Sequence, residues 1–346
     1  MSNVRPFTHD DLVRVLFGSS AFQLLDAAAE LELFQLLHRR PGLGAAAIGI
    51  ALSLAPRPVQ ILLLGTTALG FTVHDAGAYR NATLIDAMIG DGSWEIIEDL
   101  IDYEAQIVRP AEVDLVASLR ENTNVGLRRI PGEGADLYHR LAANPALEQL
   151  FYRCMRSWSR LSNPILVAEG KLGGARRVLD VGGGDGVNAI ALAEANPSVA
   201  FTVVDLPGAA AIAREKIAER GLTARIAVQE LDIFDDDYPR GHDCVLFANQ
   251  LVIWSPEQNV RLLRKAYDAL PPGGKVLVFS AISDESGDGP LYAALDNVYF
   301  ATLPAPNATI YHWGQYEEWL TAAGFHGVER RPGRAWTPHG VVSATR

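Results

Sequence analysis

The sequence predicts an α/β protein in which a mainly helical N-terminal half precedes a half built on a parallel sheet. From Arg177 onward, short β-branched runs alternate with amphipathic helical segments, which is typical of a parallel sheet covered by helices on both faces. Before that point, apolar residues recur at helical spacing, beginning with the stretch from Leu12 to about Arg40. A glycine-rich turn directly after the first strand marks the expected ligand site.

Length and composition limit the classes of function. A chain of 346 residues suits two domains, which we expect at 1–160 and 161–346. Its 30 Lys and Arg against 41 Asp and Glu give a net charge of −11, which opposes binding to nucleic acid or anionic lipid. Two cysteines, Cys154 and Cys244, are too few for a disulfide framework or a Cys-ligated zinc site. Without a signal-like segment or a membrane-length apolar run, the expected location is the cytoplasm.

Residues 41–81 are expected to form helices followed by a hairpin that turns at Ala76-Gly77. Two helices and a hairpin are typical of a winged helix. The helix that would enter DNA offers mainly Arg57 and Gln60 as base-contacting side chains and is otherwise apolar or small. We therefore interpret this half as a winged-helix-like dimerisation domain and not as a DNA-binding domain.

The remaining elements follow from periodicity. Long helices are predicted over 93–120 and 145–172. The strands are expected in RVLDVGG, AFTVVDLP, RIAVQELD, DCVLFANQL and KVLVFSAI, and the helices around 187–196, 208–220, 257–270 and 315–324. GVERR and the C-terminal segment have no helix between them, so they are expected to close the sheet as an antiparallel pair.

The glycine-rich turn runs from Asp180 to Gly186, between a strand and a helix. Gly182 and Gly184 let a ligand approach the backbone, and the helix start presents unpaired N–H groups. Asp205 ends the second strand, 205 − 186 = 19 residues after the last glycine, where a carboxylate can accept hydrogen bonds from both hydroxyls of a ribose. This arrangement predicts a nucleoside cofactor.

S-adenosylmethionine (SAM) fits this turn better than NAD does. The NAD fingerprint needs a third glycine where this chain has Val187, and Asp180 suits the ammonium group of a methionine moiety better than a pyrophosphate. Asp232 and Ile233 end the third strand, where the adenine edge would lie, with Phe234 beside them. The alternative is that the turn only packs helix against strand and that the acids are ordinary strand ends.

VLDVGGGDG, VVDLPGAA, LDIF and ALPPGGKVLV, at these separations, resemble the class I small-molecule O-methyltransferases. In that family a helical dimerisation domain precedes a Rossmann-like catalytic domain. The resemblance covers nearly the whole chain and is specific from 150 to 325; it implies a homodimer that binds SAM and acts on a small molecule. The implied and expected cofactor-binding residues are Met155, Ser159, Asp180, Gly182, Gly184, Asp205, Leu206, Asp232, Ile233 and Phe234.

The chain departs from this family at the catalytic base. Family members carry a His-Asp-Trp motif after the fourth strand, and its His takes the proton from the substrate hydroxyl. Here Trp254 aligns with the Trp and Val252 occupies the His position, where an isopropyl group accepts no proton. Two supporting glutamates fall on Ser280 and near Ile310. A phenol with a pKa of about 10 would have no His to deprotonate it, so ordinary O-methylation is not the first expectation.

Methyl transfer to carbon needs proximity and an activated carbon, for example an enol formed with the help of a base or a metal. NTNVGLRRIPG, LYHRL, QLVIWSPE, LDNVYF and WTPHG most resemble the branch of the family that methylates C3 of α-keto acids, precursors of β-methyl amino acids in specialised metabolism. We therefore expect C-methylation of an α-keto acid. The alternatives are O-methylation of an aromatic hydroxyl with an unusual base, and a SAM-binding protein that no longer transfers methyl.

The candidate catalytic residues are His312, Asn249 and Gln250. His312 lies on the loop that roofs the substrate in this family and could be a base or metal ligand, or a helix cap. The two amides could orient a carbonyl or cap the backbone. Arg128 or Arg129 could clamp a substrate carboxylate, or lie on a solvated face. A divalent or ferric metal stays open, because no His or carboxylate pair has a fixed local ligand spacing.

Overall fold

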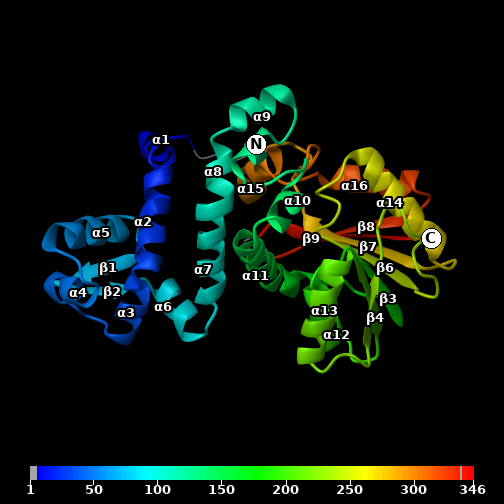
Figure 1. Cartoon of the computed structure of the whole chain (residues 1–346), viewed down its shortest axis with the longest axis horizontal. Coiled ribbons are helices and arrows are strands. Elements are labelled where there is room, and N and C mark those ends of the chain that lie inside the picture. Colours follow the sequence, from blue (N-terminus) through cyan, green and yellow to red (C-terminus); the bar gives the residue numbers. More distant parts are fainter. Residues whose placement is uncertain (1–5, 173, 336) are drawn as a thin grey trace. The chain divides into compact units, whose positions relative to one another are not determined.

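A computed structural model describes residues 6–172, 174–335 and 337–346 of the chain (Figure 1). It forms two compact units, Met1–Ala105 and Gln106–Arg346. The units divide at Ala105, whereas the sequence places the domain boundary at 160. The difference arises because the helices between these positions pack against helices and strands of the C-terminal unit.

The N-terminal unit is helical apart from one hairpin. Its elements are α1 (His9–Leu16), α2 (Gly18–Glu30), α3 (Leu33–Arg39), α4 (Ala45–Ala51), α5 (Pro56–Ala68), β1 (Thr72–Asp75), β2 (Ala78–Asn81), α6 (Thr83–Gly90) and α7 (Trp94–Tyr103). The predicted hairpin is confirmed: Ala76 and Gly77 both have positive φ, as tight two-residue hairpin turns require. In its core, the ring of Phe34 packs edge-on against Phe71 and Trp94.

The C-terminal unit is built on a seven-stranded sheet in the order β5-β4-β3-β6-β7-β9-β8. Its strands are β3 (Arg177–Val181), β4 (Ala200–Asp205), β5 (Ile226–Glu230), β6 (Cys244–Ala248), β7 (Lys275–Ala281), β8 (His326–Pro332) and β9 (His339–Thr345). The first five in chain order pair in parallel, and β9 is antiparallel to both of its neighbours. The predicted parallel sheet and its antiparallel closing pair are therefore confirmed.

Helices cover both faces of this sheet (Figure 1). One core lies beneath α14 and α16, and the other beneath α11, α12 and α13. The helical segments are η1 (Glu104–Val108), which crosses the unit boundary, α8 (Arg109–Glu112), α9 (Leu115–Glu121), η2 (Val125–Arg129), α10 (Leu137–Ala142), α11 (Pro145–Glu169), α12 (Val187–Ala195), α13 (Pro207–Glu219), α14 (Pro256–Ala269), α15 (Leu291–Thr302) and α16 (Trp313–Ala322).

Two helical regions differ from the sequence prediction. The continuous helix expected over 93–120 is divided into α7, the π-helical η1, α8 and α9. Pro110 lies at this division, and its missing N–H cannot complete a regular helical ladder. Helix α15 was not predicted, because Asp296 and Asn297 interrupt its apolar pattern.

No single helix within the described residues is long and apolar enough to cross a membrane, although two bent helix pairs in the N-terminal unit reach that length and hydropathy when each pair is counted together.

Candidate active site

The glycine-rich turn connects the carboxyl end of β3 to the start of α12. Gly182, Gly184 and Gly186 have φ values of +67°, +58° and +79°, a region that side chains disfavour. A Cβ on Gly183 would lie 2.7 Å from Oδ2 of Asp180, whereas a Cβ on Gly184 would point into open space. The turn is thus compact on its inner side and leaves room beside Gly184 for a ligand.

Asp205 ties the end of β4 to this turn. Its Oδ2 accepts a hydrogen bond from the Gly184 N–H at 2.8 Å, and its Oδ1 accepts one from the Leu206 N–H at 2.7 Å. Burial raises the pKa of this carboxyl, and the two backbone donors oppose that rise. Leu206 is 56% exposed, so it offers apolar surface next to a carboxylate that can accept from a ribose.

Asp180 is fully buried at the end of β3. Neither of its carboxylate oxygens has a hydrogen-bond partner among the described residues. Burial, together with the nearby charge of Asp205, raises the pKa of Asp180 to about 7. A buried carboxylate without a partner fits a cation, and the ammonium group of a methionine moiety would satisfy it. The residues present therefore fit SAM.

Helix α11 lies beside the same turn. Nε of Arg156 is 3.1 Å from Oδ2 of Asp185, and the Asn163 amide donates to the Val187 carbonyl at the start of α12. Ser159 and Met155 lie four and eight residues before Asn163, so all three fall on one helical face. The predicted pair thus shares a helical face with Asn163, which contacts the start of α12. Asn163 was not predicted, and its Oδ1 is buried without a partner among the described residues.

The loop after β5 holds the third predicted group. Oδ1 of Asp232 accepts hydrogen bonds from the N–H groups of Phe234 and Asp235, at 2.8 and 3.1 Å. Nζ of Lys265 donates to the carbonyls of Ile233 and Phe234, at 2.7 and 2.8 Å. These bonds fix the loop at the carboxyl edge of the sheet, next to the end of β4.

The predicted catalytic amides follow β6. Asn249 adopts a positive φ of 53°, and its N–H donates to the Phe279 carbonyl. The side chain of Gln250 lies over Gly182, because a Cβ on that glycine would be 2.6 Å from Oε1 of Gln250. Gln250 is thus brought to the glycine turn.

The positions that carry acid–base residues in the family hold other groups here. Val252 is only 4% exposed, and its carbonyl accepts a hydrogen bond from the Thr309 N–H. Ser280 is fully buried and accepts a hydrogen bond from the Tyr316 hydroxyl at 3.3 Å. Neither Val252 nor Ser280 is a base at neutral pH.

His312 precedes α16 as its N-cap residue. Its backbone N–H donates to Oε1 of Gln315 at 3.1 Å. The ring Nδ1 is buried and has no hydrogen-bond partner in the part of the chain that the structure describes. The backbone of His312 therefore caps the helix while its ring nitrogen stays available, so the geometry is compatible with both interpretations of this residue.

Arg128 and Arg129 converge on a single carboxylate. Asp114 accepts hydrogen bonds from Nε of Arg128 at 2.9 Å and from Nε of Arg129 at 2.8 Å. These guanidinium groups hold the pKa of Asp114 well below its usual range. The three side chains join η2 to the start of α9. A clamp on a substrate carboxylate would have to use the remaining N–H groups of these arginines.

Asp296, in α15, is a candidate that the sequence analysis missed. It is half-buried, desolvation raises its pKa to about 7, and it has no hydrogen-bond or ion-pair partner among the described residues. The signal was available, since Asp296 is the one acidic residue of the segment LYAALDNVYFAT. It had no meaning until the segment was known to be a helix.

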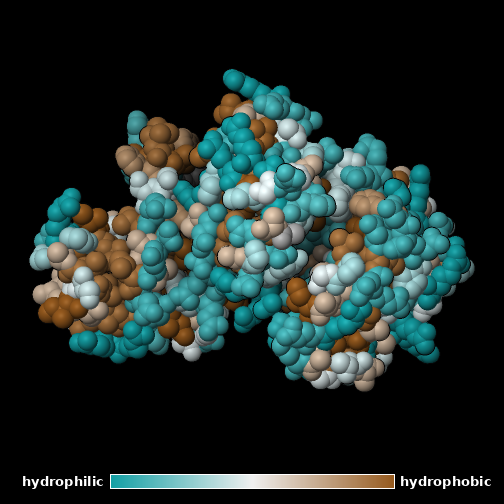
Figure 2. Space-filling model, viewed as in Figure 1, coloured by the Kyte–Doolittle hydropathy of each residue, from teal (hydrophilic) through white to brown (hydrophobic). Residues whose placement is uncertain are grey.

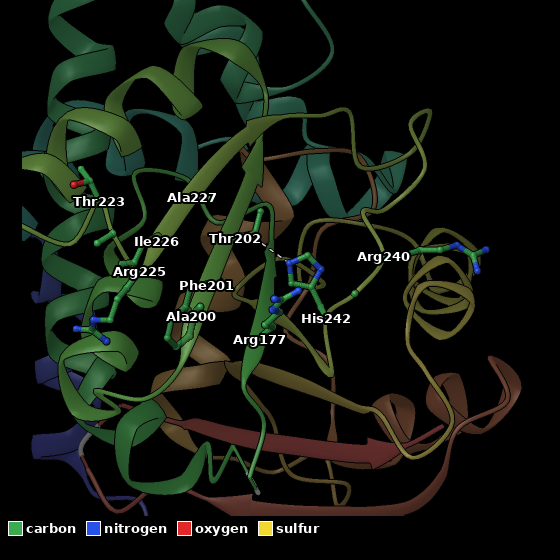
Figure 3. A pocket seen from close by; sticks show the side chains of 12 residues that line it. Arg177, Ala200, Phe201, Thr202, Thr223, Arg225, Ile226, Ala227, Arg240 and His242 are labelled. Atoms are coloured by element: carbon green, nitrogen blue, oxygen red, sulfur yellow. Dashed lines mark hydrogen bonds between the residues drawn. The ribbon is translucent and has the colours of Figure 1, made fainter.

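Two further features do not add to the site. Among the described residues, no group of three His, Cys, Asp or Glu side chains is arranged to hold a metal ion, so no metal site is assigned. A cavity of about 330 Å³ lies at the amino ends of β3, β4 and β5, the sheet edge opposite to the glycine turn (Figure 3). Its His242 ring is already bonded to Thr202 and Pro239, and its Arg225 donates to a carbonyl of α12.

Comparison with known proteins identifies the family of this chain. Residues 113–326 match the model of the O-methyltransferase domain family. The L-tyrosine C(3)-methyltransferase of Streptomyces lavendulae is 49% identical over 343 residues, which cover 99% of this chain and 94% of that protein. The crystal structure of the S-adenosylmethionine-dependent methyltransferase SibL, in its apo form, is 56% identical, with a TM-score of 0.88 over 97% of this chain and 98% of that one.

A more distant fold neighbour is human N-acetylserotonin methyltransferase in complex with SAM. It is 21% identical, with a TM-score of 0.83 over 100% of this chain and 99% of that one. The chain belongs to the O-methyltransferase domain family. It is a SAM-dependent methyltransferase that acts on a small molecule, so the predicted family, fold and cofactor are confirmed. When bound, SAM supplies a methyl group carried on a sulfonium sulfur.

Proposed function

We propose that this enzyme transfers the methyl group to carbon, at C3 of a tyrosine-type substrate. The observation that carries the proposal is the buried Val252 at the position of the family base, in a chain that keeps the glycine turn and its Asp205 contact. With Val252 in place of the His, no base lies at the position from which family members deprotonate the oxygen that receives the methyl group. The relative from Streptomyces lavendulae is named for a carbon acceptor, which supports the same conclusion.

Two carbons of a tyrosine-type molecule are numbered C3. The ring carbon next to the hydroxyl-bearing carbon is a nucleophile, because the oxygen lone pair is delocalised onto it. The side-chain carbon becomes acidic only beside a ketone, that is, in the α-keto acid predicted from the sequence. We propose the ring carbon of the amino acid, since the relative is named for L-tyrosine itself. Side-chain methylation of the α-keto acid is the second candidate. Like methylation of the ring carbon, it does not use the His that Val252 replaces.

The roles of the predicted residues are part of this proposal. The carboxylate of Asp180 would hold the methionine ammonium group, and Asp205 the ribose, with Asp232 and Phe234 at the adenine edge. Met155 and Ser159 would lie at the methionine end. Gly182, Gly184, Leu206 and Ile233 complete the proposed cofactor-binding residues. Asn249, Gln250 and His312 would orient or deprotonate the substrate. Arg128 and Arg129 would bind its carboxylate.

The test is a direct product analysis. The enzyme is incubated with methyl-labelled SAM and, separately, with L-tyrosine, its α-keto acid and a simple phenol. Mass spectrometry and NMR then locate the label. Label on ring C3 of tyrosine is the expected result. Label on the side-chain carbon of the keto acid would select the second candidate, and label on oxygen would contradict both.

We further propose that two copies form a two-fold dimer through the N-terminal unit. Figure 2 shows hydrophobic side chains gathered on the surface of this unit. Large apolar side chains of α4, α5 and α6 are mostly exposed, namely Ile50, Ile61, Leu64 and Leu84. Apolar patches of this kind usually mark interfaces, and the family resemblance implies self-association.

A further inference from the structure

Helix α15 contacts α11 through Tyr292, which shares its helical face with Asp296 and Tyr299. Tyr292, Asp296 and Tyr299 are spaced i, i+4 and i+7, so they share a face of the helix. The Tyr292 ring packs edge-on against Trp158 of α11, with 5.6 Å between ring centroids. Trp158 directly precedes Ser159. Asp296 therefore lies on the face of α15 that borders the helix with the predicted cofactor contacts.

The next residue of α15 connects to the segment where the family base is missing. Oδ1 of Asn297 accepts hydrogen bonds from the Thr309 hydroxyl and the Ile310 N–H, at 3.0 and 2.9 Å. The Thr309 N–H in turn donates to the carbonyl of Val252 at 2.9 Å. This chain of bonds ties Asn297, the residue that follows Asp296, to the segment that holds Val252.

The chemical state of Asp296 suits proton transfer. Its carboxylate has no hydrogen-bond or ion-pair partner among the described residues, and burial alone raises its pKa to about 7. A base whose pKa lies near the working pH is the most effective. The elements packed against α15 are α8, α9, η2 and α11, and none of their charged residues contributes to that shift. The charged residues of these elements include Arg109, Glu112, Arg120, Glu121, Arg128, Arg129 and Arg156.

We propose that Asp296 is the residue that accepts the hydroxyl proton of the phenolic substrate. The inference rests on the proposed function, since it requires a substrate with a phenol. Asp296 would replace the His that other family members place at position 252, from a different helix.

The proton and electron balance is complete with these groups. As Asp296 takes the hydroxyl proton, the O–H electron pair forms a carbonyl, and the ring carbon forms a bond to the methyl group. The pair of the broken carbon–sulfur bond stays on sulfur. The ring carbon then loses its hydrogen to water as the ring regains aromaticity, and the carbonyl oxygen takes its proton back from Asp296. The net release is one proton.

The first test compares Asp296→Asn with the exposed control Asp268→Asn in α14. We expect D296N to lower kcat for L-tyrosine by roughly 100-fold or more, the usual contribution of a general base, with little change in KM or SAM affinity. The acid limb of the wild-type kcat–pH profile should be lost. Unchanged kcat would overturn the proposal. So would a raised KM for tyrosine but not for its keto acid, since that would make Asp296 the partner of the substrate ammonium.

The second test needs no turnover. In 3-nitrotyrosine a nitro group occupies one of the two equivalent ring carbons next to the hydroxyl-bearing carbon, and the phenolate form absorbs visible light. A carboxylate in contact with its oxygen should raise the pKa of the bound probe in the wild type and in D268N, and D296N should remove that rise. If neither tyrosine nor its keto acid is methylated, the proposed function fails, but this titration still decides the contact. The same pKa for bound 3-nitrotyrosine in the wild type, D268N and D296N would show that Asp296 does not contact the phenol oxygen.

Discussion

At the scale of single residues, the proposed cofactor site contains polar groups that lack protein partners. Both oxygens of Asp180 are buried without a partner among the described residues, and so is Oδ1 of Asn163. Unpartnered polar groups cost stability in a protein interior. A fold that keeps them beside a glycine turn trades stability for binding, so substitutions here should affect the two properties in opposite directions.

Asp180→Asn should show this opposition. The pKa of Asp180 is raised from 3.8 to about 7 in the folded chain, so the unfolded chain releases this proton first as pH rises. Stability due to this group is therefore present below pH of about 4 and is lost as the pH rises to about 7. In ligand-free protein, the Asn variant should have the higher Tm at pH 8, and the difference should vanish near pH 4. A lower Tm at pH 8 would contradict the assignment.

Asp205→Ala tests the ribose contact. Loss of charged hydrogen bonds should weaken SAM binding by about 1.5–3 kcal/mol, measured by calorimetry. Because Asp205 also accepts from two backbone N–H groups, Asp205→Asn is the milder companion variant and should lower stability less. The exposed Asp237→Asn serves as control. Wild-type SAM affinity in both Asp205 variants would mean that the ribose lies elsewhere.

At the scale of elements, the turn between β3 and α12 combines backbone strain with open space. Gly184 and Gly221 both have positive φ, of 58° and 67°, and a Cβ on either would meet no atom within 4 Å. They differ in place: Gly184 borders the proposed cofactor site, whereas Gly221 follows α13. Alanine substitutions at these two glycines therefore separate the effect of an unfavourable backbone conformation on stability from the effect of an added methyl group on ligand binding.

Gly184→Ala and Gly221→Ala should each lower the free energy of unfolding by about 1–2 kcal/mol, since a left-handed conformation is costly for alanine. Only Gly184→Ala should also weaken SAM binding, because its methyl group enters the space left for the ligand. Denaturant unfolding and calorimetry measure the two effects. Equal SAM affinity in both variants would place the cofactor away from the turn.

Much of the cofactor site could be predicted from the sequence, because its parts are local. Asp180, Gly182 and Gly184 stand between a strand and a helix, and parallel strands bring Asp205 and Asp232 to the same edge. The acid–base groups could not be predicted in this way. The proposed base, Asp296, lies on a helix that contacts α11 through Tyr292 and Trp158, a contact between distant segments of the chain.

At the scale of the whole molecule, the N-terminal unit carries apolar surface on α4, α5 and α6 that its own core does not bury. The sequence indicated an apolar half with a hairpin, and the structure has both. The division of the chain at Ala105 was not predicted. Helical periodicity runs through both units without a polar linker between them, so pattern alone gives no boundary.

Light scattering tests self-association. The wild type should give a particle of twice 37.4 kDa at micromolar concentration. Leu64→Asp, at a side chain that is 73% exposed on α5, should shift the population toward the monomer, because a buried charge without a partner is costly. Ala218→Asp places the same charge on an exposed position of α13 as control. A monomeric wild type would rule the dimer out.

The order of strands in the sheet has a consequence for synthesis on the ribosome. β9 lies between β7 and β8, so β8, although made earlier, has no place in the sheet until residues 339–345 arrive. A nascent chain that ends before them exposes the open edge of β7 and an unpaired β8, which favour association with other chains. We therefore expect the C-terminal unit to close only after its last strand leaves the exit tunnel, and to depend on chaperones until then.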